Sequence, residues 1–211
     1  MDYYHGSGTD ISLFDESFLG IGVEQEGSGF YFTESLSEAE GYAFHRLEAD
    51  LEKPGGEDNP SVMVVDIAID DDALIRGGET ITADTIRHII LQGIERTKEP
   101  DVFLDCLANF GDVNYEGLDS VIENAVDAYS HYEDILPTLF ALSNDLFTGE
   151  EGIFLRITSE LTGYEGVYAE HEGDSPNHLI VWLPEAITIK AVLAVAPDDN
   201  VTQSVVNRPH L

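Results

Sequence analysis

Residues 29–51 read GFYFTESLSEAEGYAFHRLEADL, and this stretch decides how the N-terminal part of the chain folds. Its first five residues place aromatic side chains directly after a glycine, which is typical of a strand that follows a tight turn. Ser37 and Glu40 have the spacing of a capping box at a helix N-terminus. Apolar residues then recur at helical spacing as far as Pro54. The stretch therefore predicts a strand over 30–33 and a helix over about 35–53.

Strand patterns lie toward both ends of the chain, and helical patterns lie between them. Runs rich in β-branched and aromatic residues predict strands at 3–5, 61–69, 166–169, 178–183 and 186–195. Apolar residues at helical spacing predict helices at 82–97, 101–109, 117–132, 135–147 and 150–161. We therefore expect an α+β fold, with one domain over 1–196, a helical insertion over about 82–162 and a C-terminal tail over 197–211.

Acidic residues dominate the charge of the chain. It has 42 Asp and Glu against 9 Lys and Arg, which is a formal net charge of −33 with histidine neutral. A surface this negative repels nucleic-acid phosphates and anionic membranes, so it excludes a conventional nucleic-acid or membrane-surface binder. Two explanations stay open: a surface adapted to high salt, or a negative face that imitates nucleic acid or docks on a basic partner.

The sequence shows no sign of secretion, membrane insertion or disulfide chemistry. Its single cysteine, Cys106, lies in an apolar stretch and excludes an intrachain disulfide. The N-terminus lacks the basic and apolar regions of a signal peptide, and no uncharged run approaches the ~20 residues that span a bilayer. We expect a soluble, intracellular protein of the cytoplasm that has no membrane partner.

Two short motifs place chemistry-bearing residues near the first two strands. His5 ends a short strand and is followed by Gly6 and Ser7, which are small enough for a ligand to approach the backbone closely. A histidine there can hold a sugar hydroxyl, while the backbone groups of the glycine can pair with a carboxamide. Tyr31 on the next strand and Tyr42 on the following helix can face one slot. Two tyrosines can sandwich a flat ring such as nicotinamide.

Taken in this order, the motifs resemble those of the ADP-ribosyltransferase superfamily, in the poly(ADP-ribose)-polymerase-like branch with its His-Tyr-Glu triad. The resemblance covers the N-terminal motifs and the C-terminal strands, and the helical middle of the chain has no counterpart in it. It implies a split β-sheet core that holds NAD as the substrate. It also implies that His5 holds the ribose of NAD, Gly6 the carboxamide and Ser7 a ribose hydroxyl, while Tyr31 and Tyr42 stack on nicotinamide.

The third motif departs from the family pattern. The family strand reads Asn-Glu-Tyr-x-Val followed by an aromatic residue, and residues 177–182, NHLIVW, resemble it with His178 in the place of the catalytic glutamate. In the family, that carboxylate stabilises the positive charge that develops as the bond to nicotinamide breaks. Three alternatives stay open. Glu172 or Glu170 from the preceding turn takes the role, His178 serves a modified transfer, or the domain binds NAD-like ligands without turnover.

The turn before the last motif also contains side chains that metal ions use as ligands. His171, His178, Glu170 and Glu172 can supply zinc ligands, but no cysteine accompanies them. The chemistry that the resemblance implies requires no metal. We therefore expect none at this site.

The resemblance implies a mono-ADP-ribosyltransferase that moves ADP-ribose from NAD to a protein or nucleic-acid acceptor and releases nicotinamide. A looser likeness to small phage-encoded transferases, some of which are anti-CRISPR proteins, implies a protein acceptor in a host cell. A nucleic-acid-binding acceptor with a basic groove would suit the negative charge. Two alternatives remain. One is a catalytically inactive acidic interaction protein on the same fold, a nucleic-acid mimic or inhibitor. The other is a relative of the RNA 2′-phosphotransferases, which the scarcity of basic residues disfavours.

If the surface is adapted to high salt, NaCl should stabilise the fold strongly. Raising NaCl from about 0.1 M to about 1 M shortens the Debye length from about 10 Å to about 3 Å and screens the repulsion among carboxylates. We expect the Tm, followed by circular dichroism, to rise by about 10 °C. Sucrose at the same osmolality serves as the control, because it stabilises by exclusion from the surface and not by screening. A Tm that does not respond to NaCl would contradict salt adaptation and favour the partner-directed explanation.

Overall fold

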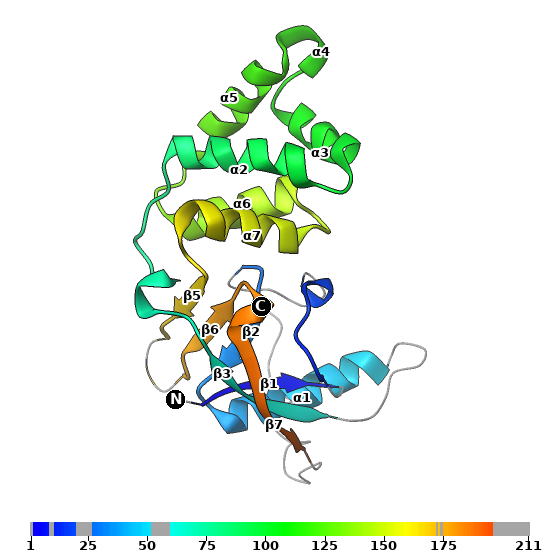
Figure 1. Ribbon diagram of the computed structural model, residues 1–211, viewed down its shortest axis with the longest axis vertical. Coiled ribbons are helices and arrows are strands. Elements are labelled where there is room, and N and C mark those ends of the chain that lie inside the picture. The colour runs from blue at the N-terminus through cyan, green and yellow to red at the C-terminus, as the bar shows by residue number, and fades with distance from the viewer. Residues whose placement is uncertain are drawn as a thin grey trace. The chain divides into compact units, whose positions relative to one another are not determined.

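The computed structural model describes residues 2–8, 11–19, 27–51, 60–171, 173 and 175–195 (Figure 1). The described strands are β1 (Tyr3–Ser7), β2 (Phe30–Thr33), β3 (Ser61–Ile67), β4 (Leu74–Ile75), β5 (Gly166–Ala169), β6 (His178–Val181) and β7 (Ile187–Ala194). The described α-helices are α1 (Leu36–Leu51), α2 (Ala83–Arg96), α3 (Pro100–Leu107), α4 (Val113–Glu116), α5 (Leu118–Tyr129), α6 (Ile135–Leu146) and α7 (Glu151–Thr162). These elements confirm the predicted α+β class. The predicted tail over 197–211 and Glu172 lie outside the described residues.

The strands form one mixed seven-stranded sheet with the order β4-β5-β6-β2-β1-β3-β7. β1 pairs antiparallel with both β2 and β3, with Tyr4 opposite Thr33 and His5 opposite Met63. β4 pairs parallel with β5, whereas β5 and β6 are antiparallel. The helices α2–α7 come between β4 and β5 in the chain. Strands from both ends of the sequence therefore contribute to the sheet.

The chain divides into two compact units. Unit 1 comprises Met1–Leu13, Phe32–Ile67 and Thr188–Leu211, and unit 2 comprises Phe14–Tyr31 and Ala68–Ile187. Unit 1 therefore holds β1, β3, α1 and most of β7, whereas unit 2 holds α2–α7 together with β4, β5 and β6.

In unit 1, the capping residue of α1 is Ser35, two residues before the Ser37 that the sequence predicts. The hydroxyl of Ser35 accepts a hydrogen bond from the backbone N–H of Glu38 at 3.3 Å, and the hydroxyl of Thr33 donates to the Glu38 carboxylate. Thr33 also accepts from the backbone N–H of Ser35 at 3.1 Å, so the chain turns directly at the end of β2. The capping pair is therefore Ser35 with Glu38, and the prediction of Ser37 with Glu40 is wrong.

The packing of α1 on β1 depends on Gly6 (Figure 1). A Cβ atom at Gly6 would lie 2.0 Å from the backbone oxygen of Ala39 and 2.8 Å from the backbone nitrogen of Ala43. Ala39 and Ala43 are both fully buried. The helix backbone thus rests directly on the strand, and any side chain at Gly6 would push the two apart.

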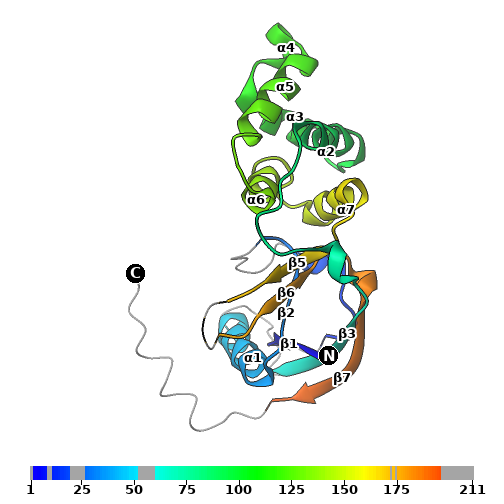
Figure 2. The ribbon, with the colours of Figure 1, turned by 90° about the vertical axis from the view of Figure 1, so that its left-hand side faces the viewer.

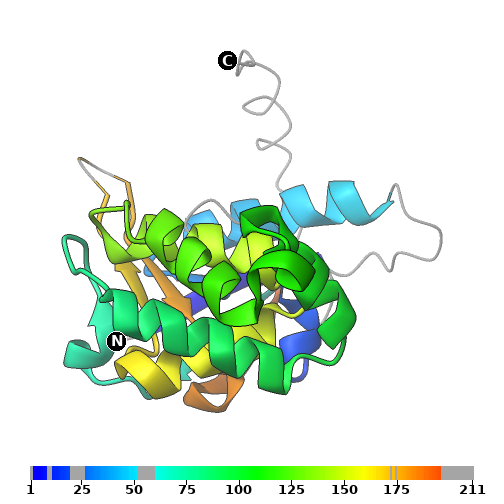
Figure 3. The ribbon, with the colours of Figure 1, turned by 90° about the horizontal axis from the view of Figure 1, so that it is seen from above.

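In unit 2, the helices α2–α7 surround an apolar core and α6 and α7 lie nearest to β5 and β6 (Figures 1 and 2). These helices, coloured green to yellow, face the viewer in Figure 3. The ring of Phe147 meets those of Phe103 and Phe154, with centroid distances of 5.0 and 5.1 Å. Leu139, Phe154 and Trp182 help to line a space of only about 30 Å³ between α6, α7 and β5. This part of unit 2 is therefore closely packed.

Arginine side chains connect separate segments of unit 2. The pairs are Arg87 Nε with Glu123 Oε1 at 2.7 Å, Arg96 Nη1 with Glu160 Oε2 at 2.6 Å, and Arg156 Nη1 with Glu185 Oε1 at 2.8 Å. Hydrogen bonds from these arginines lower the pKa of each glutamate. Because the folded-state pKa is the lower one, this stabilisation is present above the ordinary pKa of glutamate and is lost as the pH falls through the lowered values.

The Gly6 contact predicts a large difference between two glycine-to-alanine variants. We expect Gly6→Ala to lower the free energy of unfolding by about 3 kcal/mol, because the new methyl group overlaps the α1 backbone. Gly41→Ala in the same helix is the matched control, since no atom lies within 4 Å of a Cβ there. Alanine at position 41 should raise the free energy of unfolding by about 0.5 to 1 kcal/mol through helix propensity. Urea unfolding measures both, and equal effects would contradict the packing of α1 on β1.

Candidate functional site

Three of the predicted site residues form the C-terminal end of β1 in unit 1. His5 lies opposite Met63 of β3, and its ring centroid is 5.7 Å from that of Phe32, with the two rings tilted by 53°. Ser7 is buried and lies opposite Ser61. Gly6 lies between them with its Cβ position filled by the backbone of α1. The structure therefore holds this tripeptide between β3 and α1.

Tyr42 lies on α1 beside the same helix–strand contact. It directly precedes Ala43, whose backbone nitrogen packs over Gly6. The residue is 49% exposed, whereas Ala43 is fully buried. His5, Gly6, Ser7 and Tyr42 thus all belong to unit 1, and about half of the Tyr42 surface is accessible to a planar ligand.

Tyr31 belongs to unit 2 and is held by the turn that precedes it. Its hydroxyl donates a hydrogen bond to the backbone oxygen of Gly27 at 2.5 Å. Gly29 in this turn has a φ of +151°, and a Cβ atom there would lie 2.4 Å from Cγ2 of Ile180. Only glycine allows both this backbone conformation and the close approach to β6. The orientation of Tyr31 is therefore fixed by local contacts within unit 2.

His171 and His178 contact each other across the hairpin of β5 and β6 in unit 2. His178 is the first residue of β6 and lies opposite Ala169, the last residue of β5. His171 comes two residues after Ala169 in the chain. Nε2 of His171 lies 3.1 Å from Nδ1 of His178. Their ring centroids are 4.6 Å apart, and the ring planes form an angle of 74°. The sequence marks both histidines, but their direct contact follows only from the hairpin register.

Asn177 holds the backbone of this hairpin in place. Its side-chain oxygen accepts a hydrogen bond from the backbone N–H of His171 at 3.2 Å, and its side-chain nitrogen donates to the hydroxyl of Tyr168 at 3.0 Å. The amide of Asn177, which directly precedes β6, therefore bonds both the Tyr168 hydroxyl on β5 and the backbone of His171. This network reduces the conformational freedom of the two imidazoles.

Arg76 stacks on the ring of Tyr168 and forms an ion pair with Glu170. Its guanidinium carbon lies 4.4 Å from the centroid of the Tyr168 ring. The guanidinium also forms ion pairs with Asp71 and, at 3.4 Å, with Glu170. The hydrogen bond with Asp71 raises the pKa of Arg76 further above its ordinary value. Among the acidic candidates of the third motif, Glu170 is thus paired with Arg76, whereas Glu172 lies outside the described residues.

Sequence reasoning missed Arg76 and Tyr168 as parts of this cluster. Arg76 lies 94 positions before its partner Glu170, so no local spacing connects the two residues. The one signal in the sequence was the scarcity of basic residues. Because acidic residues greatly outnumber them, each arginine is expected to pair with a carboxylate.

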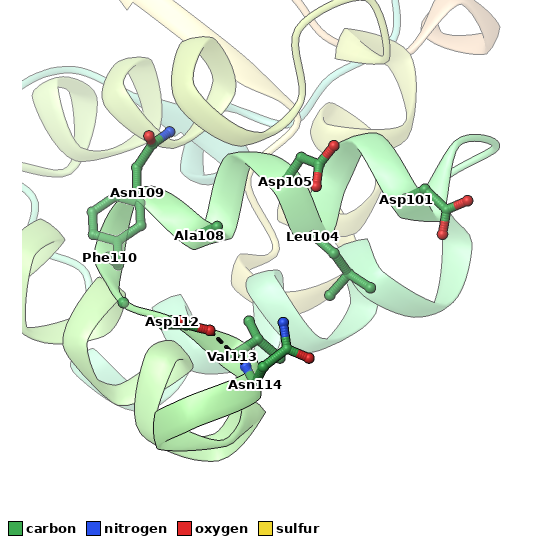
Figure 4. A pocket seen from close by; sticks show the side chains of 10 residues that line it. Asp101, Leu104, Asp105, Ala108, Asn109, Phe110, Asp112, Val113 and Asn114 are labelled. Carbon is green, nitrogen blue, oxygen red and sulfur yellow. Dashed lines mark hydrogen bonds between the residues drawn. The ribbon is translucent and has the colours of Figure 1, made fainter.

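A hollow among the helices of unit 2 is lined by none of the predicted site residues (Figure 4). It has a volume of about 890 Å³ and is lined by residues of α3, α4 and the segment between them. Asp101, Asp105 and Asp112 contribute carboxylates, while Leu104 and Phe110 contribute apolar surface. These carboxylates repel phosphate groups, so the hollow does not suit a dinucleotide.

Neither a metal cluster nor a membrane span emerges from the part of the chain that the structure describes. There, no group of three or more His, Cys, Asp and Glu side chains is placed to hold a metal ion. None of the described helices is both long and apolar enough to cross a bilayer.

Comparisons of the chain with protein families, curated proteins and solved structures find no match.

The hydrogen bond between Tyr168 and Asn177 predicts energetic coupling between these side chains. In a double-mutant cycle of Tyr168→Phe and Asn177→Ala, we expect a coupling energy of about 1 kcal/mol in urea unfolding. The matched control pairs Tyr168→Phe with Asn124→Ala, whose amide donates to the backbone oxygen of Phe110. That pair should be additive within about 0.5 kcal/mol. Additivity in the first cycle would contradict the network around the histidines.

Proposed function

We propose that the protein is a mono-ADP-ribosyltransferase, which transfers ADP-ribose from NAD to an acceptor and releases nicotinamide. The observation that carries the proposal is the contact between β1 and α1 in unit 1. There His5 and Gly6 lie within the last three residues of β1, and Tyr42 lies on the part of the helix that packs over Gly6. This arrangement supports the roles that the resemblance implies for these residues.

Each residue of the β1–α1 contact has a chemical role in the proposal. The imidazole of His5 offers a hydrogen bond to a ribose hydroxyl. Gly6 presents backbone donor and acceptor groups without a side chain to cover them, which suits a carboxamide. Tyr42, with about half of its surface exposed, offers a π-face to the nicotinamide ring. Ser7 supplies a further hydroxyl. The resemblance implies Tyr31 as the second aromatic ring.

In the proposed reaction the bond between C1′ of the ribose and the nicotinamide nitrogen breaks. Nicotinamide leaves as a neutral molecule, and C1′ acquires oxocarbenium-like positive charge. A nucleophilic atom of the acceptor forms the new bond to C1′ and gives up its proton. A carboxylate near the ribose stabilises the developing charge. Glu172 is the favoured carboxylate, because Glu170 is paired with Arg76 and His178 with His171.

Nicotinamide release from NAD tests the proposal. We expect His5→Ala to lower the rate at least about 100-fold, because the ribose loses its hydrogen-bond partner in the transition state. His88→Ala on α2 is the matched control and should retain the rate, since this histidine is 52% exposed on the helical part of unit 2. NAD carries net negative charge, so the assay is run at low and at about 1 M NaCl.

The same assay assigns the third catalytic group. Loss of release in Glu172→Gln, with Glu170→Gln active, would assign the role to Glu172. Loss in His178→Gln alone would assign a modified transfer to the histidine. If no salt concentration gives release, and NAD leaves the Tm unchanged, the transferase proposal is overturned.

A second candidate function is favoured by the net charge of −33 and by the engagement of His178 with His171. It is an acidic interaction protein without turnover, a nucleic-acid mimic or inhibitor. Such a protein would keep its affinity for a basic partner in His5→Ala, because partner binding then depends on the surface charge and not on the β1–α1 contact. Binding and release assays on the same variant therefore separate the two candidates.

A further inference from the structure

The hairpin of β5 and β6 presents two imidazole nitrogens at the separation that one metal ion requires. Nε2 of His171 and Nδ1 of His178 are 3.1 Å apart, and the ring centroids are 4.6 Å apart. Two imidazole nitrogens that bind one ion at about 2.1 Å, with an angle of about 90° between the bonds, are about 3.0 Å apart and place their centroids about 4.6 Å apart. A straight N–H···N hydrogen bond of the observed length would place them about 5.4 Å apart.

The hairpin therefore holds the two nitrogens within the reach of one ion. We propose that His171 and His178 form a binding site for a divalent transition-metal ion that prefers nitrogen ligands, such as Ni²⁺ or Cu²⁺. This proposal replaces the expectation of no metal at these residues. It does not require the proposed transferase activity, for which His178 is one of the candidate third catalytic groups.

The hairpin holds the ligands in place before the metal arrives. Asn177 bonds both the backbone of His171 and the hydroxyl of Tyr168, and the register places His178 opposite Ala169. Ligands held in this way lose little conformational entropy when the ion binds. The support is comparable to the outer hydrogen bonds that orient histidines at metal sites.

The identity of the ligands selects the class of metal. Imidazole suits nickel, copper and zinc, whereas Mg²⁺ and Ca²⁺ require oxygen ligands. A bond angle near 90° is typical of the tetragonal geometry of Cu²⁺ and Ni²⁺. Since the described residues contain no metal-binding group of three or more side chains, water or another external ligand would take the remaining positions of the two-histidine site.

The binding step moves one proton and changes no oxidation state. In the neutral pair, one imidazole donates its N–H to the other. When the ion binds, that proton moves to the outer nitrogen of its own ring, and both inner lone pairs then coordinate the metal. The net charge of −33 favours the approach of the cation.

Calorimetric titration of the tag-free protein with Ni²⁺ tests the site. NaCl at about 0.5 M screens the acidic surface, and excess Mg²⁺ occupies sites made of carboxylates alone. We expect one Ni²⁺ per chain, and at least about tenfold weaker binding in both His171→Gln and His178→Gln. His88→Gln is the matched control, because this histidine lies 3.5 Å from the Asp84 carboxylate and makes an ordinary surface histidine–carboxylate pair.

Electron paramagnetic resonance of the Cu²⁺ complex gives a second readout that folding defects cannot imitate. The wild-type spectrum should show hyperfine coupling to two imidazole nitrogens, and each single variant should show coupling to one. Circular dichroism confirms that the variants are folded. If either variant binds Ni²⁺ as tightly as the wild type, or if the wild type binds none beside Mg²⁺, the proposal is overturned.

Discussion

The folded structure has to remain stable against the electrostatic repulsion among 42 acidic side chains. The few basic residues are placed where they counter it most directly. Each of the four arginines whose side chains are described, Arg76, Arg87, Arg96 and Arg156, pairs with carboxylates from other parts of the chain. In unit 1, Lys190 does the same between Asp2 and Asp66. The ion pairs are partly exposed, so the close-packed aromatic core supplies most of the opposing free energy.

A chain with so few cations also places its chemistry-bearing residues by packing and by neutral hydrogen bonds. In unit 1, the absence of a side chain at Gly6 lets the backbone of α1, the helix that carries Tyr42, rest on β1. In unit 2, the amide of Asn177 organises the hairpin that carries His171 and His178. Neither arrangement requires a buried charge, which would be expensive to desolvate.

The helices and strands could be predicted because their patterns are local. The apolar spacing over 82–97 and 135–147 predicts α2 and α6 closely, and the aromatic run after Gly29 predicts β2. Three local features were not predicted correctly. The strand β4 has only two residues, too few for an alternating pattern. The helix α4 has only four residues, too few for a periodic pattern, and the true capping pair is Ser35 with Glu38. In the latter case two overlapping Ser-x-x-Glu patterns compete, and the hydrogen bonds of Thr33 select the earlier one.

The sequence by itself determined the α+β class, the order of the longer helices and strands, the acidic surface and the residues that the proposed chemistry requires. Only the tertiary structure decided which of these residues meet. The strand register places His178 beside His171, and the close approach of α1 makes Gly6 a packing position. Arg76 forms an ion pair with Glu170, which lies 94 positions further along the chain. The physical reason is that helix and strand patterns arise between neighbours along the chain. Pairings across a hairpin or between distant segments depend on register and packing, which no local pattern encodes.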